Sequence, residues 1–238
     1  MDTYPGYSYK RFKQRHRFFP WFAGGLVVVL CAFVANLFFG CVKFGPKPEE
    51  FFSEEFTFFA ETSEPFTSRT EAVAAAKSEE ADGFAGYVTT EPWCVVSEVF
   101  TRERAGTTEF IVPATEVMLV RKEHKTLFNP IFASFGANFE WLCDMTAEFQ
   151  TQKITAREIV DVAVMRYKNL QHLAADLDGI QETAQSPLYA TTLLALNKQA
   201  IALYMLSTEA ASPNFLHELR RAACAVCFAY VELVKNSC

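Results

Sequence analysis

The longest uninterrupted apolar stretch of the chain lies near its start, at residues 18–42, which contain no charged side chain. A helix needs about 20 apolar residues to cross a lipid bilayer. The eight positions before this stretch hold five Lys/Arg residues and His16, and basic flanks stay on the cytoplasmic side of a membrane. We therefore expect a basic cytoplasmic tail at residues 1–17, a single transmembrane helix at 18–42 in the lipid bilayer, and extracytoplasmic domains after it.

A cleaved signal peptide is the alternative interpretation of the same stretch. Its apolar run is longer than the usual apolar core of a signal peptide, about 7–15 residues, and no Ala-x-Ala cleavage site follows it. Phe38 to Cys41 loosely resembles a lipoprotein cleavage box, but Phe stands where small residues are needed. The sequence therefore favours an uncleaved anchor in the cell membrane.

Beyond the apolar stretch the hydrophobic pattern becomes mixed. Two prolines indicate a linker at residues 43–50, because proline disfavours helix. In residues 51–122, Ser68 and Glu71 form a capping-box pattern that begins an alanine-rich helix, and a second short helix is expected at 101–108. We expect strands at residues 56–60, 85–88, 93–100 and 114–120. The order β-α-β-β-(α)-β predicts a small ferredoxin-like sheet with helices on one face.

Residues 129–236 have helical spacing of apolar positions throughout. Helix starts are marked by capping side chains, three of them followed by proline. These starts are Asn129-Pro130, Thr155 to Glu158, Ser186-Pro187 and Ser212-Pro213. They predict four helices, at residues 130–150, 156–178, 187–209 and 213–235. Short connections make such neighbours antiparallel, so the whole chain is expected to be of the α+β class.

Charge is distributed unevenly along the chain. The net charge is −6 overall, and residues 1–43 contribute +5, which leaves −11 for residues 44–238. Proteins that bind nucleic acid carry basic patches, so an acidic outer region argues against a nucleic-acid partner. Neutral sugar or protein surfaces fit this charge better.

Candidate chemistry is sparse. Seven cysteines are scattered, and the one Cys-x-x-Cys pair, Cys224 and Cys227, has no second pair to complete a zinc site, which favours buried structural thiols. The four histidines form no HExxH pattern, and no Gly-x-Ser-x-Gly elbow, P-loop or GxGxxG occurs. The sequence therefore favours a non-catalytic protein without metal or cofactor, and an enzyme is the least favoured class.

The middle section resembles the SPOR (sporulation-related repeat) domain. The resemblance is carried by an aromatic first strand, an alanine-containing helix, a glycine-rich approach to the second strand and a hydrophobic third strand. In this chain these are Phe56–Ala60, the helix from Ser68, Gly83–Val88 and Trp93–Phe100. The whole chain is similar to single-span envelope proteins of clostridial bacteria, which have a basic tail, one anchor, a SPOR-like domain and a helical C-terminal region.

The resemblance implies a ligand. Known SPOR domains bind peptidoglycan glycan strands that lack stem peptides, through the open face of the sheet, so this chain would bind cell-wall glycan in division or sporulation. Aromatic rings match the flat C–H faces of sugars, and alternate residues of a strand share one face. We expect the glycan-binding residues to be Phe59, Tyr87, Trp93, Val95 and Ser97.

The chain departs from the SPOR pattern in its second half. Gly106 breaks the expected second helix early, and Pro113 follows. The alternative function is therefore a membrane-anchored interaction scaffold, in which the sheet is degenerate and the helices of residues 129–236 bind another envelope protein.

Overall fold

The computed structural model describes residues 49–53, 55–90, 92–119, 122–180 and 187–237. The predicted tail, transmembrane helix and most of the linker lie outside the described residues. Among the helices that are described, none is both long and apolar enough to cross a membrane. Residues 48–238 form one compact unit, which contains both predicted outer domains, 51–122 and 129–236.

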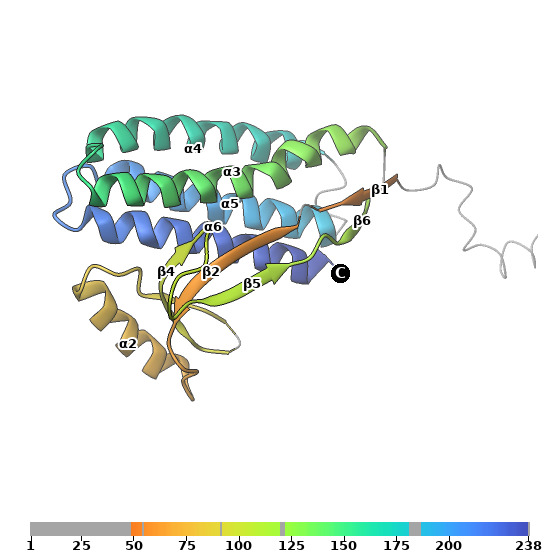
Figure 1. Cartoon of the computed structure of the whole chain (residues 1–238). Helices are drawn as coiled ribbons and strands as arrows, with labels where there is room; N and C mark the ends of the chain where they lie inside the picture. Colours follow the sequence, from red (N-terminus) through yellow and green to blue (C-terminus); the bar gives the residue numbers. More distant parts are fainter. Residues whose placement is uncertain (1–48, 54, 91, 120–121, 181–186, 238) are drawn as a thin grey trace, which may run out of the picture. The chain divides into compact units, whose positions relative to one another are not determined.

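A four-stranded antiparallel sheet lies in the first half of this unit (Figure 1). Its strands are β2 (Phe56–Thr62), β3 (Tyr87–Val88), β4 (Val95–Phe100) and β5 (Thr108–Val112), in the spatial order β3-β4-β2-β5. Helix α2 (Arg69–Ala81) connects β2 to β3. The predicted α+β class is confirmed, and so are the strand–helix–strand–strand order and the position of the alanine-rich helix.

Local signals explain the limits of α2. Ser68 Oγ accepts a hydrogen bond from the backbone N–H of Glu71 (3.3 Å), whereas the Glu71 carboxylate accepts from Thr67 (2.7 Å). The helix ends at Ala81 with Asp82 as its C-cap, and Gly83 follows with a φ of +85°, a left-handed conformation that glycine adopts without strain. One face of α2 then packs on the sheet through small alanines.

Two sequence predictions in the middle section are wrong. Residues 101–107 contain no helix: Gly106 takes a φ of +82°, and the Thr107 N–H donates to Arg104 O (3.1 Å), so the chain turns instead. The predicted strand at 114–120 exists as β6 (Glu116–Leu119), but it pairs with β1 (Glu49–Phe52) in a separate two-stranded sheet. The predicted linker therefore ends at residue 48, and β5 is the fourth strand of the main sheet.

Four long helices follow and lie side by side (Figure 1). They are α3 (Lys125–Gln150), α4 (Ala156–Asp178), α5 (Pro187–Thr208) and α6 (Phe215–Ser237). The capping box of Thr155 and Glu158 is present as predicted. Helix α3 begins before the predicted Asn129-Pro130 start, because a 3-10 turn at Lys122–His124 leads into it and places Pro130 in its second turn.

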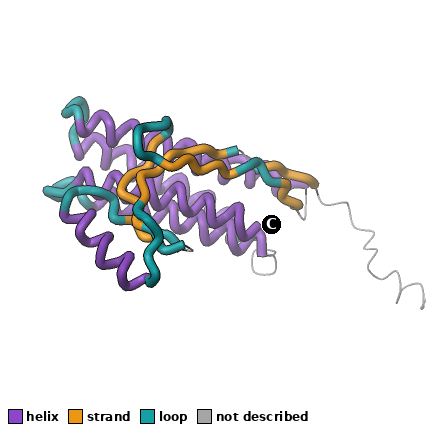
Figure 2. The backbone as a smooth tube through the Cα atoms, turned by 60° about the horizontal axis from the view of Figure 1, so that its bottom comes forward, coloured by secondary structure: helices purple, strands orange, loops and turns teal. Residues whose placement is uncertain are grey.

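Helices α3 and α6 cover the sheet face that points away from α2. Phe56 contacts the rings of Phe139 and Tyr230 at centroid distances of 5.2 and 5.1 Å, and Phe58 contacts Phe228 at 5.7 Å. The strands thus lie between α2 and the long helices (Figures 1 and 2). This differs from the prediction of helices on one face only, because the apolar face of β2 is too large to leave uncovered.

Candidate functional site

The structure places three of the predicted glycan-binding residues in internal contacts. Tyr87 stacks on Phe228 at 5.2 Å between ring centroids, and burial, followed by the charge of Glu232, raises its pKa well above the usual value. Val95 is buried beneath α2, and Ser97 Oγ donates to Glu79 Oε2 of α2 (3.0 Å). Tyr87 therefore faces the long helices, whereas Val95 and Ser97 face α2.

The other two predicted residues are partly exposed. Trp93 packs beside the alanines of α2 and forms an isolated bridge with Phe66. Phe59 is half-buried and alternates along β2 with Phe58, so it points to the side opposite the α3/α6 helices. The five residues are thus divided between the two faces of the sheet.

Part of the α2 side of the sheet is left uncovered. In the β2–β5 register Thr57 lies opposite Ile111, and Phe59 lies opposite Glu109; we call these four residues the open half-face. Ile111 is 59% exposed, because α2 packs mainly on β3 and β4.

A groove lies at the other end of the sheet, beside β3. It has a volume of about 550 Å³ and runs between α2, β3, α5 and α6; we call it the α2–α5 groove. Of the predicted site residues, Tyr87 lines it. Its apolar lining is formed by Val73, Ala76, Val88, Ile201, Ala202, Met205, Ala222 and Ala225. Ile201 and Met205 are 60% and 50% exposed, a degree of exposure that is typical of interaction surfaces when apolar residues are contiguous.

Basic side chains surround this groove. Arg69, Lys77 and Arg221 line it, and within the described residues they have no ion-pair partner. Lys198 also lines it and is paired with Glu232. The groove thus gathers positive charge on a unit whose sequence is strongly acidic.

Its acidic lining is smaller: Glu80 of α2, and Glu218, which lies 3.7 Å from His217. Among the described residues, the three cations without an ion-pair partner therefore outnumber the two carboxylates that line the groove. A ligand that brings carboxylates to the rim would gain charge-assisted contacts.

Buried polar contacts hold the groove walls together. Arg220 of α6 donates from Nη1 to the Gly83 carbonyl (2.7 Å) and pairs through Nη2 with Glu98 (3.2 Å). His217 Nδ1 lies 2.5 Å from the Phe84 carbonyl. These contacts tie α6 to the turn that follows α2, so the groove is preformed, and a preformed site costs less free energy to fill.

In the helical region Cys224 and Cys227 lie in the core, and Cys143 is partly buried against it. Burial, followed by the charge of Asp144, raises the pKa of Cys143 to about 12, and the pKa values of Cys224 and Cys227 are also raised by burial. Thiols with raised pKa values are poor nucleophiles. Among the residues that the structure describes, no cluster of His, Cys, Asp and Glu is arranged to hold a metal ion.

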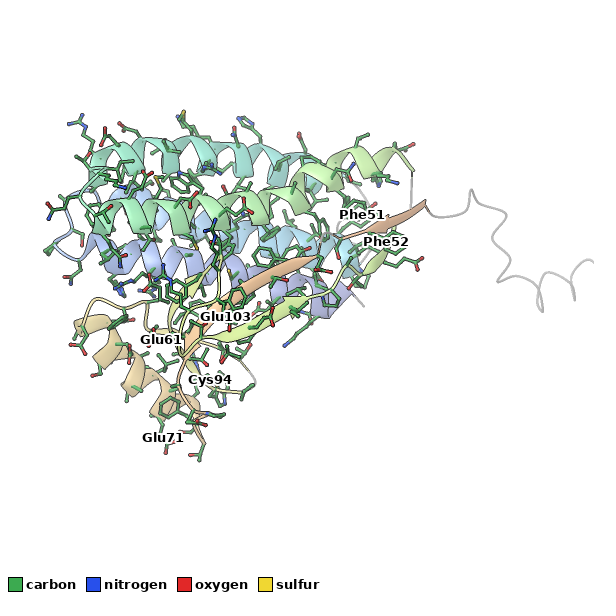
Figure 3. The ribbon with its side chains drawn as sticks, in the orientation of Figure 1. Phe51, Phe52, Glu61, Glu71, Cys94 and Glu103 are labelled. Atoms are coloured by element: carbon green, nitrogen blue, oxygen red, sulfur yellow. The ribbon has the colours of Figure 1, made fainter. Side chains whose placement is uncertain are left out.

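Figure 3 shows another exposed aromatic side chain, Phe52, on β1. It is 59% exposed and lines a smaller cavity of about 320 Å³ with Phe51, Asn129 and Pro130. This cavity has no basic side chain in its lining, so it lacks the combination of apolar and basic side chains that lines the α2–α5 groove.

The groove was missed in the sequence because it joins segments that are far apart in the chain. One signal was present: α5 is apolar on more than one side. Leu194, Ile201 and Met205 recur at helical spacing and are all exposed, while Leu196 and Leu203 form the buried face. A helix that is apolar all round is usually fully buried. The exposed apolar side chains of α5 therefore indicate that this side of the helix contacts another molecule.

No protein-family model, no curated protein and no solved structure matches this chain. The resemblance to the SPOR domain therefore stays a prediction.

Proposed function

We propose that this chain is a membrane-anchored, non-catalytic interaction protein that binds a partner polypeptide in the α2–α5 groove. The observation that carries the proposal is an apolar groove of about 550 Å³ lined by three cations that have no ion-pair partner among the described residues, on a unit whose net charge is −12. Protein interfaces combine an apolar centre with a polar rim. The partner's segment would therefore carry apolar side chains for the groove and carboxylates for its rim.

The location follows from the apolar stretch at residues 18–42. An anchor there would hold the unit of residues 48–238 at the outer surface of the cell membrane, with the N-terminus in the cytoplasm. The partner is then another envelope protein, and the helices α5 and α6 supply one wall of its binding site.

The test uses a photoreactive amino acid placed in the full-length protein in its native membrane. We expect the label at Ile201, in the groove, to form a discrete adduct whose cross-linked segment contains Asp or Glu beside apolar residues. The matched control is Met165 on α4, which is 59% exposed and lies outside the groove lining; it is expected to form none. Equal labelling from both positions, or no adduct with protein from Ile201, would contradict the proposal.

Glycan binding is the second candidate function, and the open half-face favours it. Half-buried Phe59 and exposed Ile111 lie on the same side of the sheet, next to Glu109, and sugar rings pack on apolar surfaces with a polar rim. The fragment 48–238 should then sediment with amidase-treated sacculi, and Phe59→Ala should abolish the sedimentation. Retained sedimentation in Phe59→Ala, or none in the unchanged fragment, would remove this candidate.

A further inference from the structure

The groove floor is formed by the outer edge of the main sheet. Strand β3 is the last strand in the order β3-β4-β2-β5, and among the strands that the structure describes it pairs with β4 alone. Both Tyr87 and Val88 line the groove. An edge strand offers a row of backbone N–H and C=O groups to another chain, and here that edge opens into an apolar space.

The direction of the β3 hydrogen bonds identifies the residue that faces outward. The Thr89 N–H donates to Cys94 O (2.9 Å), and Tyr87 and Val88 lie opposite Val96 and Val95. In an antiparallel ladder the residues bonded to a neighbour alternate. Tyr87 and Thr89 therefore bond to β4, and the N–H and C=O of Val88 point into the groove.

The two walls of the groove continue the two layers that cover the sheet. On one side α2 packs on β3 and β4, and its Val73 and Ala76 line the groove. On the other side α6 packs on β3 and β4, and its Ala222 and Ala225 line the groove together with Ile201 of α5. The groove thus has the layered surroundings of one more strand.

We infer that the partner segment binds as an extended strand that adds to the outer edge of β3 between α2 and α5/α6. This inference rests on the proposed function and names the form of the ligand. A strand that is covered on both faces is apolar on both. Successive apolar side chains at the centre of the partner segment would therefore pack in turn against Ala76 on one side and Ile201 on the other. Carboxylates at the ends of the segment would reach Arg69, Lys77 and Arg221, all of which line the groove.

The experiment selects a phage-displayed random 12-residue library against residues 48–238, a unit that contains its own core. Clones are compared on three proteins: the unchanged unit, Ile201→Asp in the groove, and Met165→Asp as the control. Both substituted side chains are about equally exposed, at 60% and 59%, so neither change disturbs the core. Circular dichroism of each variant checks the fold.

We expect clones that bind the unchanged unit and Met165→Asp, and bind Ile201→Asp at least tenfold more weakly. Their sequences should hold apolar residues two apart, flanked by Asp or Glu. The backbone amides of a bound strand fall into two alternating sets, and only one set faces β3. A synthetic peptide from such a clone should therefore lose at least tenfold in affinity when the amides of that set are N-methylated. It should keep its affinity when the amides of the other set are methylated.

Two other outcomes separate the inference from the proposed function. Strand addition would be overturned if the clones that depend on the groove had apolar residues three and four apart, as in a helix. It would also be overturned if methylation of either set of amides had the same effect on affinity. In both cases the groove would remain a binding site. A selection that yields no clone sensitive to Ile201→Asp would overturn both.

Discussion

The two faces of the main sheet are covered in different ways. On one face the rings of Phe56 and Phe58 interlock with aromatic rings of α3 and α6 at centroid distances of 5.1–6.2 Å. On the other face α2 presents small alanines, Ala72 and Ala76, against Val95. The first face supplies a large continuous core. The second covers half of the sheet and leaves the groove and the open half-face beside it, so the binding surfaces lie where packing is thinnest.

The largest expected effect contrasts two neighbouring phenylalanines. Replacing Phe58, which is fully buried against the long helices, with Ala should destabilise the unit by about 3–5 kcal/mol, because it opens a cavity among packed rings. The same change at half-buried Phe59 should cost about 1 kcal/mol. Urea unfolding of residues 48–238 measures both, and equal losses would contradict the assignment of faces.

The next prediction concerns the close approach of β3 to α2. Gly86 has a φ of +54°, and a Cβ there would lie 2.5 Å from Glu80 Cγ and 2.6 Å from the Ala76 carbonyl. Gly86→Ala should therefore cost about 2–3 kcal/mol from backbone strain and the clash. The matched control is Gly83→Ala, with a φ of +85° but open space, which should cost about 1 kcal/mol.

Thermal unfolding of these two glycine variants gives their order. If Gly83→Ala were less stable than Gly86→Ala, α2 would not be in close contact with the chain at β3. The groove wall formed by α2 would then not be fixed in place.

A smaller effect on stability is expected from a change of pH. It concerns the sheet face that is covered by α3 and α6. Burial raises the pKa of Cys143 to about 12, whereas an unfolded thiol ionises near 8.5. The folded state keeps its proton longer, so the free energy of unfolding should fall as pH rises from about 9 toward 12. In Cys143→Ala this fall should be smaller. An identical pH profile in the variant would contradict the burial of this thiol.

How much of this fold the sequence predicts depends on the range of each signal. The start of α4 follows from the Thr155 capping box, and α2 begins directly after its predicted cap, Ser68, because capping is decided within a few residues. The predicted linker at 43–50 includes the first two residues of β1, and the strand itself is not predicted, because its partner β6 lies more than sixty residues further along the chain. Strand β5 was missed, and the turn before it was predicted as helix.

The candidate site was less predictable than the fold. Alternation along the strands separates Val95 from Val96, but it does not say which helix covers which side. Tyr87 was predicted for an open glycan face, and it lines the groove while stacking on Phe228. The cations Arg69, Lys77 and Arg221 come together only through the packing of α2 near α6, which no local pattern encodes.

The most direct test of the account is amide hydrogen exchange at Val88, measured by NMR on residues 48–238 with and without a groove-selected peptide. We expect the Val88 amide, which points into the groove, to gain at least tenfold protection on binding, while the amide of Tyr87, already bonded to β4, changes little. Peptide binding that leaves Val88 exchange unchanged would contradict it.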